Sequence, residues 1–160
     1  MTGDATNGDL LARLQRVEDE LAVQRVVLGY GPAADAGLGD LAGSRWLEDG
    51  EYDWDGKRTP HQGRDAIQAM LSSNAHLGLI GHGAAHVAGP VLVELDGDRA
   101  TALHYSLIMR HEEGRFYVWR VSAARWDLER TGDGWAVRRR TNRLLDDAGE
   151  GLELFKAAMG

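Results

Sequence analysis

The sequence predicts an α+β domain in which N-terminal helices pack on one face of a curved sheet. In the first half of the chain apolar residues recur at helical spacing, and from about residue 86 the period changes from 3.6 to two. Short turns such as Asp96-Gly97-Asp98 separate the alternating segments. Helices followed by a run of strands are typical of the α+β class. With 160 residues and 43% hydrophobic side chains, the chain is long enough for one domain with a substantial core.

The first helix is the longest one that the pattern predicts. Residues 1–8 are polar and are expected to be a disordered N-terminus, and Asp9 is a suitable N-cap. The helix that follows should turn one apolar face inward. It should end or kink before Pro32, because proline removes a helical hydrogen bond. Its apolar positions are Leu10, Leu11, Leu14, Val17, Leu21, Val26, Val27 and Tyr30.

Shorter helices are predicted at three further places. Residues 40–47 are expected to form a short helix that buries Leu41 and Trp46, and residues 63–73 an amphipathic helix. The domain proper is expected to cover residues 9–146, and residues 147–160 to form a C-terminal tail helix.

The strands are predicted from alternation and from the turns between them. A short strand at 51–54 is expected to end in an Asp55-Gly56 turn, and residues 78–83 to form a glycine-rich link. The remaining strands should form an antiparallel meander and cover residues 86–95, 100–111, 115–130 and 135–145.

Composition excludes several classes of protein. The formal net charge of −7 argues against nucleic acid or an anionic membrane as the main partner, and the absence of cysteine excludes disulfides and thiolate sites. No apolar run of membrane-spanning length is present, so we expect a cytoplasmic protein. His82 and His86 have the spacing of a helical metal pair, but the glycine between them disfavours a helix, and we expect no metal site. No phosphate loop or dinucleotide fingerprint is present, and we expect no cofactor.

Two polar side chains stand in an apolar, small-residue stretch, VVLGYGPAADAG, at 26–37. Tyr30 and Asp35 are the only strongly polar side chains between Arg25 and Asp40. A polar group buried without a partner costs roughly 1–3 kcal/mol, so each should be hydrogen-bonded. Tyr30 could simply close the core of the first helix, and Asp35 could be a turn or cap residue.

The order of these motifs resembles the SnoaL-like branch of the nuclear-transport-factor-2-like superfamily. The resemblance covers about residues 10–146 and rests on Tyr30 and Asp35 at the end of the first helix, the GRDAI helix at 63–67, the DGDRATA hairpin at 96–102 and DGWAV at 133–137. Relatives include scytalone dehydratase, bile-acid 7α-dehydratase, hexachlorocyclohexane dehydrochlorinase, polyketide cyclases and the small subunits of ring-hydroxylating dioxygenases. The resemblance implies a cone-shaped, cystatin-like α+β barrel, while function varies widely on this fold.

By position, the resemblance implies a catalytic group of His86, Asp35 and Tyr30. In the dehydratase-like members the histidine removes a proton, the aspartate orients it, and the tyrosine polarises a carbonyl or assists a leaving group. A carboxylate that accepts from one ring nitrogen does leave the other nitrogen as a base. Two departures are Pro90, where many relatives have asparagine, and Pro32 between Tyr30 and Asp35.

Further residues are candidates for the substrate pocket. His104 shares a strand face with Ala102 and Ser106, and Arg140 matches an arginine that binds an anion or carbonyl in relatives. Alternation places Arg138, Arg140 and Asn142 on one face unless a bulge intervenes. His104 could instead be an exposed strand residue, and Arg140 a solvated or interface residue. Aromatic candidates for a flat ligand are Trp119, Tyr117 and Trp54.

Three functions follow. The first is a cofactor-independent, dehydratase-like lyase or isomerase that acts by His–Asp acid–base chemistry on a small apolar or polycyclic carbonyl compound. The second is a polyketide cyclase or related ring-forming enzyme, and the third a non-catalytic binding or assembly subunit. The outer face of the sheet should need covering, so we expect a homo-oligomer, with a trimer favoured over a dimer because dehydratase-type relatives are trimers.

Overall fold

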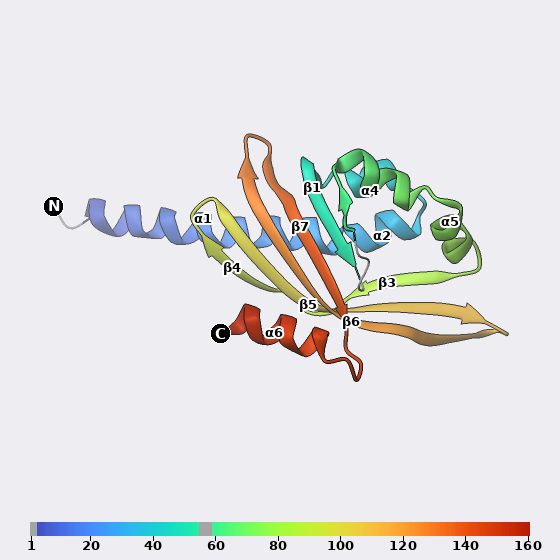
Figure 1. The fold of residues 1–160 in the computed structure, drawn as a ribbon. Helices are drawn as coiled ribbons and strands as arrows, with labels where there is room; N and C mark the ends of the chain where they lie inside the picture. The colour runs from blue at the N-terminus through green and yellow to red at the C-terminus, as the bar shows by residue number, and fades with distance from the viewer. Residues whose placement is uncertain (1–2, 55–58) are drawn as a thin grey trace.

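A seven-stranded mixed sheet forms the centre of the molecule (Figure 1). The computed structural model describes residues 3–54 and 59–160. The sheet order is β2-β1-β7-β6-β5-β3, and β4 also pairs with β5. Only β1 and β7 run parallel; the other pairs are antiparallel. The strands are β1 Trp46–Trp54, β2 His61–Gln62, β3 Ala84–Ala88, β4 Leu92–Asp96, β5 Arg99–Glu112, β6 Arg115–Thr131 and β7 Gly134–Leu144.

Helices cover both faces of the sheet. The inner, concave face receives the second half of α1 together with α2, and α4 and α5 complete that side (Figure 1). On the outer face α6 packs on β6 and β7. Its Phe155 ring also meets the Tyr105 ring of β5 edge to face, with 5.1 Å between the ring centroids. The helices are α1 Gly3–Leu28, α2 Tyr30–Asp35, α3 Gly39–Gly43, α4 Arg64–Leu71, α5 Asn74–Gly81 and α6 Glu150–Met159.

The core lies between the helices and the inner face of the sheet. Val23 and Val27 of α1 and Ile67 of α4 are fully buried, as are the rings of Trp46 and Trp126. This arrangement confirms the predicted α+β class with N-terminal helices on a curved sheet. Among the described residues, no helix is long and apolar enough to cross a membrane.

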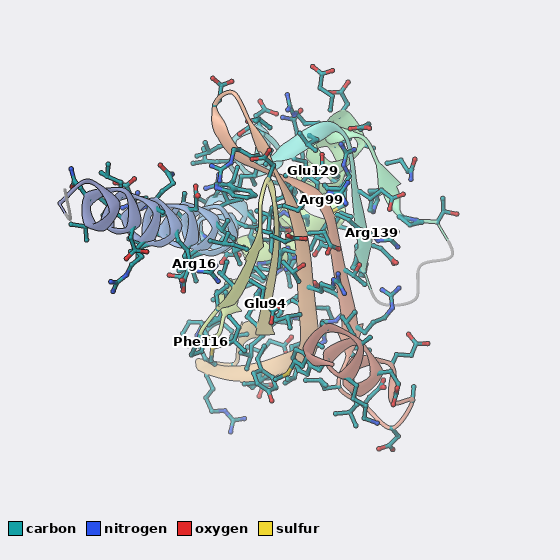
Figure 2. The ribbon with its side chains drawn as sticks, turned by 90° about the vertical axis from the view of Figure 1, so that its left-hand side faces the viewer. Arg16, Glu94, Arg99, Phe116, Glu129 and Arg139 are labelled. Atoms are coloured by element: carbon teal, nitrogen blue, oxygen red, sulfur yellow. The ribbon has the colours of Figure 1, made fainter. Side chains whose placement is uncertain are left out.

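The first helix begins earlier than expected. It starts at Gly3 rather than after Asp9, so the helix includes residues 3–8. A helix that is already nucleated gains a hydrogen bond with each added residue, even where it buries nothing. The expected inward face is also only partly realised: Leu10, Leu14 and Val17 are at least half exposed, because this part of α1 extends beyond the sheet (Figures 1 and 2).

Three other boundaries differ from the pattern. The predicted helix at 40–47 ends at Gly43, so Leu41 is exposed and Trp46 opens β1. Residues 78–81 belong to α5 rather than to a loop, because the Ser73 hydroxyl caps that helix by accepting from the His76 backbone N–H. The strand expected at 86–95 is divided into β3 and β4, since Pro90 has no N–H for the ladder. The Asp55-Gly56 turn lies outside the described residues.

Candidate active site

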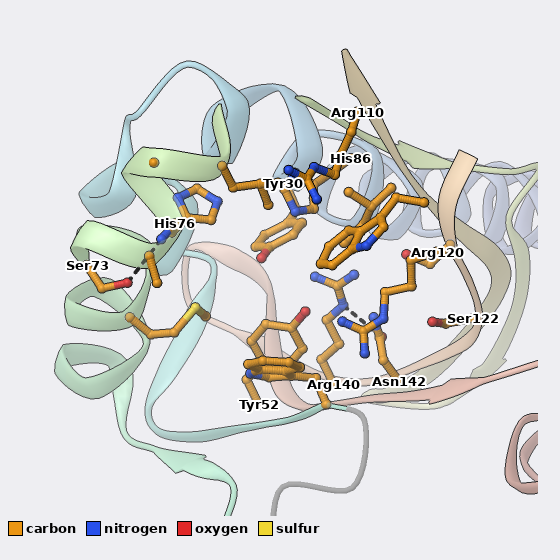
Figure 3. A pocket seen from close by; sticks show the side chains of 18 of the residues that line it. Tyr30, Tyr52, Ser73, His76, His86, Arg110, Arg120, Ser122, Arg140 and Asn142 are labelled. Atoms are coloured by element: carbon orange, nitrogen blue, oxygen red, sulfur yellow. Dashed lines mark hydrogen bonds between the residues drawn. The ribbon is translucent and has the colours of Figure 1, made fainter. Parts of the chain in front are cut away.

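A cavity of about 560 Å³ opens between the inner face of the sheet and helices α2, α4 and α5 (Figure 3). This volume is typical of a small-molecule site. Tyr30, His86 and Arg140 line it, with Tyr52 beside them. The other residues in its wall are Trp54, Met70, Ser73, Ala75, His76, Gly78, Leu79, His82, Ser106, Ile108, Arg110, Trp119, Arg120, Ser122 and Asn142.

Asp35 holds His86 by two hydrogen bonds. One carboxylate oxygen, Oδ2, accepts from the His86 backbone N–H at 2.7 Å, and the other, Oδ1, contacts the ring nitrogen Nδ1 at 2.5 Å. An ionised carboxylate can only accept, so the proton of this contact lies on Nδ1. The second ring nitrogen, Nε2, therefore keeps a lone pair for the cavity.

The local backbone explains how Asp35 reaches β3. Pro32 lies in the first turn of α2, where a helix does not need the missing N–H, so the proline starts a new helix instead of disrupting one. Gly31 allows α2 to approach β3 closely, because a Cβ at this position would lie 2.2 Å from the His86 carbonyl oxygen. Tyr30, the first residue of α2, lines the cavity, and Asp35, the last, holds His86 in the cavity wall.

Tyr30 is 4% exposed and lies between three aromatic rings. Trp46, Tyr52 and Trp126 each meet its ring edge to face at 5.6–6.2 Å. Burial raises the pKa of Tyr30 well above its usual range, Tyr52 raises it further, and the Arg140 charge only partly offsets this. The phenol therefore stays protonated and can act only as a neutral hydrogen-bond donor or acceptor.

Arg140 is buried, at 3% exposure, without a carboxylate partner among the described residues. Its guanidinium lies over the rings of Tyr30, Tyr52 and Trp126 at 4.3–4.7 Å. Its Nε donates to the Asn142 side-chain oxygen at 3.2 Å, and its Nη1 is buried with no hydrogen-bond partner. Arg140 is one of the residues that line the cavity, so its guanidinium is a candidate to bind a ligand oxygen.

A bulge in β7 separates Arg140 from its neighbour. The β6–β7 register shifts between Asp127 and Leu128, so the bulge that would change the alternation is present, and Arg138 and Arg140 do not share a face. Arg138 points outward to Asp49 and Glu129, whereas Arg140 points into the cavity.

His104 supports the site from behind the cavity wall. It is 4% exposed, its Nδ1 lies 2.9 Å from the Tyr105 carbonyl oxygen, and its Nε2 accepts from the Trp126 indole N–H at 2.9 Å. Burial lowers the pKa of His104 to about 4, so the ring is neutral. His104 was expected to line the cavity, but it lies behind the wall. There it orients Trp126, which in turn packs on Arg140.

Two of the three aromatic candidates line the cavity, and the third does not. Trp54 and Trp119 line it, and the Arg120 guanidinium lies 5.4 Å from the first ring and 5.8 Å from the second. Tyr117 lies further along β6 and is not part of the described wall. Pro90 is also outside it, so the exchange of asparagine for proline at this position does not alter the cavity lining.

His76 is a residue that sequence reasoning missed, since it was expected to be solvated. Its ring lies 5.6 Å from the His86 ring, and both of its nitrogens are buried without a hydrogen-bond partner. Burial lowers the pKa of His76, and the nearby His86 ring lowers it further. The Leu71 carbonyl acts in the other direction and raises this pKa, although it lies outside hydrogen-bond geometry. The Ser73 cap of α5 was the signal that could have placed it. Tyr52 was missed because strand alternation alone did not show which face of 51–54 is inward.

No group of three or more metal-ligating side chains occurs in the described part of the chain. The cavity is surrounded by an imidazole that a carboxylate orients, a neutral phenol and a guanidinium without a carboxylate partner among the described residues.

The fold and this cavity define an NTF2-like protein of the cystatin-like type. The model of the SnoaL-like domain matches residues 15–141, and the chain belongs to this family. Among curated proteins no sequence matches. An NTF2-like protein with a cystatin-like fold from Novosphingobium aromaticivorans is 40% identical, with a TM-score of 0.90 over 96% of this chain and 98% of that one.

More distant structures share the fold. A putative aromatic ring hydroxylase from Novosphingobium aromaticivorans is 25% identical, with a TM-score of 0.67 over 81% of this chain and 91% of that one. A protein from Catenulispora acidiphila, solved in complex with S-DNPA, is 19% identical, with a TM-score of 0.65 over 78% of this chain and 92% of that one. These structures show that the fold of this chain recurs in proteins of low sequence identity.

Proposed function

We propose that this protein is a cofactor-independent lyase or isomerase, of the dehydratase type, for a small apolar or polycyclic carbonyl compound. The observation that carries the proposal is the Asp35–His86 contact beside an open cavity. A non-catalytic subunit would have no need for a carboxylate-oriented imidazole at a cavity wall.

The residues support the following steps for a β-hydroxy ketone. His86 Nε2 takes the proton next to the carbonyl, and the C–H electrons form an enolate. The Arg140 guanidinium and the Tyr30 hydroxyl donate hydrogen bonds to the oxyanion as its charge develops. The enolate then forms the C=C bond, the β C–O bond breaks, and the leaving hydroxide receives the proton from His86 to give water.

The mostly apolar wall supplies orientation and excludes water. Trp54, Trp119 and Met70 offer flat or flexible apolar surface to the body of the substrate. A positioned base supplies about 10²–10⁴-fold, so the remaining acceleration must come from orientation and from the oxyanion donors.

The experiment compares wild type, His86→Ala and His111→Ala on a panel of bicyclic β-hydroxy ketones. Enone formation is followed by absorbance, and exchange of the α-proton with D₂O by NMR. We expect His86→Ala to lose both activities, and His111→Ala, the same change outside the cavity wall, to keep them. Equal rates in wild type and His86→Ala would refute the proposal. Exchange without elimination would favour the ring-forming alternative, a polyketide cyclase.

We also propose a cytoplasmic homo-oligomer, with a trimer favoured over a dimer, formed through the outer face of the sheet. The supporting observation is a group of apolar side chains that α6 does not cover. They lie on the sheet and at its β5–β6 end, and include Leu92, which is 61% exposed, and Phe116, which is 64% exposed. Sedimentation of wild type and Phe116→Asp measures this, and a monomer at micromolar concentration would contradict it.

A further inference from the structure

The first helix has two opposite faces, and among the described residues only one of them packs on another element. Asp19, Val23 and Val27 face the sheet and are buried. At about 100° per residue, the opposite side of the helix carries a straight apolar stripe. Its members are Leu10 at 59%, Leu14 at 50%, Val17 at 53%, Leu21 at 46% and Leu28 at 45% exposure.

The stripe has the spacing of a coiled-coil seam. The steps between Leu10, Leu14, Val17 and Leu21 are four, three and four residues, and a polar Gln24 and then Leu28 continue the same alternation. In heptad terms Leu14, Leu21 and Leu28 occupy a positions, with Asn7 one heptad earlier. The seam covers residues 7–28, about 33 Å of helix at about 1.5 Å per residue.

The first part of this helix lies outside the core, with Ala12 and Arg16 beside Leu95 and Gly97 of the β4–β5 hairpin. Figure 2 looks almost along it and shows its side chains, Arg16 among them, beside the sheet rather than under it. All described side chains from Asn7 to Glu18 are exposed. A helix of this length with an apolar seam is unfavourable in water unless another helix covers the seam.

The charges beside the seam identify the partner and its direction. In a parallel, in-register pair, each g residue faces the e residue of the next heptad in the other helix. Arg13 would then face Glu18 of the second copy, and Glu20 would face Arg25, so both pairs are of opposite sign. An antiparallel pair of full overlap would instead bring Glu18 against Glu18 of the second copy.

We propose that the exposed seam of α1 pairs in parallel with the same helix of a second copy of this chain, as a short two-stranded coiled coil. The helix is already ordered in the single chain, so pairing costs little backbone entropy. The seam is separate from the outer face of the sheet, and it contains none of the residues that line the cavity.

The molecular mass of the protein in solution tests whether the seam pairs. Sedimentation equilibrium of the full chain is measured for wild type, Leu14→Asp and Ala12→Asp, with circular dichroism as the check on folding. Leu14→Asp places a carboxylate in the seam and should halve the mass, or weaken pairing at least tenfold. Ala12→Asp introduces the same side chain on the other side of the helix, where Ala12 is exposed beside Leu95 and Gly97, and should leave the mass unchanged. An unchanged mass for folded Leu14→Asp would overturn the proposal.

Single cysteines test the direction, since the natural chain has none. Two a positions lie side by side in a parallel pair, within disulfide reach, so oxidised Leu14→Cys should run as a covalent dimer. Ala12→Cys should not. Glu18→Arg should weaken pairing, and Arg13→Glu combined with Glu18→Arg should restore it. A Leu14→Cys protein that stays uncrosslinked, or a double variant as weak as the single one, would overturn the parallel arrangement.

Discussion

His86 depends on a single side chain for both its position and its tautomer. Asp35 accepts one hydrogen bond from the backbone N–H and one from the ring of the same residue. The first fixes where β3 begins beside α2, and the second fixes which ring nitrogen remains basic. Catalytic geometry and local folding are therefore coupled at this residue pair.

Asp35→Asn should separate these two effects. An amide has one acceptor oxygen, so it can satisfy the backbone N–H but must offer its NH₂ group to the ring. That contact selects the tautomer with the proton on Nε2 and removes the base. We expect kcat to fall by about 10²–10⁴-fold with little change in KM. Asp40→Asn, the same change at an exposed position, is the control, and a loss below tenfold for Asp35→Asn would contradict the role of this carboxylate.

His104 and His86 show what a strand pattern leaves open. Each is a histidine on a predicted strand, yet one faces the cavity and the other forms two hydrogen bonds behind its wall. The difference lies in the side chains of the neighbouring strand: Ala124 is the residue opposite His104, and Trp126, two residues further along β6, donates its indole N–H to the His104 ring. Trp126, 22 residues further along, decides that His104 is structural.

At the scale of the elements, the contact of α2 with β3 is set by one glycine. Gly31 lies directly against the His86 carbonyl, and a methyl group at this position would clash with backbone rather than with a movable side chain. The sequence marks this place only as glycine next to proline, a pattern that also fits a helix end.

Gly31→Ala should move α2 away from β3 and so weaken the Asp35–His86 contact. Overpacking of this kind typically costs about 1–3 kcal/mol, and we expect a loss of that size together with lower turnover. Urea unfolding and turnover on the same preparations measure both. Gly8→Ala makes the same change in α1, where nothing lies within 4 Å, and should leave both unchanged or slightly raise stability. Full turnover in Gly31→Ala would show that the close approach is not needed.

Besides its buried valines, α1 is held to the sheet by one carboxylate. Asp19 is 8% exposed and accepts two hydrogen bonds from the Arg130 guanidinium, each at 2.7 Å, and one from the Trp135 indole at 3.1 Å. These bonds, Arg130 first, hold the pKa of Asp19 at about 2 although burial opposes them.

Asp19→Asn should therefore lower stability in a pH-dependent way. The folded-state pKa lies below the usual 3.8, so the carboxylate stabilises the fold fully above about pH 4, and this contribution disappears as the pH falls towards 2. We expect a loss of roughly 2 kcal/mol at pH 7. In urea unfolding, the difference between wild type and variant should shrink from pH 4 to pH 2. Asp98→Asn removes an exposed partner of the same arginine and should cost less than about 1 kcal/mol. A pH-independent difference would contradict this account.

At the scale of the whole molecule, the order of elements and the family could be predicted from the sequence, because hydrophobic periodicity and turn residues are local properties. The Asp35–His86 contact joins residues 51 positions apart and was predicted through the family resemblance alone. The faces of β7 were not predictable, since one extra residue at a bulge inverts the alternation that placed Arg138 beside Arg140. The exposed seam of α1 was assigned to the core, because periodicity shows that a face is apolar but not which surface covers it.

Arg140 lies where the requirements of fold and function oppose each other. A buried guanidinium without a carboxylate costs several kcal/mol in desolvation, and cation–π contacts return about 2 kcal/mol or more each when desolvated. The two terms are close in size, so the residue adds little net stability. Under the proposed function, the guanidinium with its unpaired Nη1 is kept in order to bind the substrate oxyanion.

Arg140→Met should consequently separate stability from activity. Methionine fills much of the same space among the three rings without a charge, so we expect the free energy of unfolding to stay within about 2 kcal/mol of wild type or to rise. Loss of the oxyanion donor should lower kcat by about 10²–10³-fold. Arg138→Met is the matched control on the same strand: it removes an outward arginine paired with Asp49 and Glu129 and should change stability modestly and turnover not at all. If Arg140→Met lost several kcal/mol of stability while folded enzyme kept its turnover, Arg140 would be a structural residue and the oxyanion would need another donor.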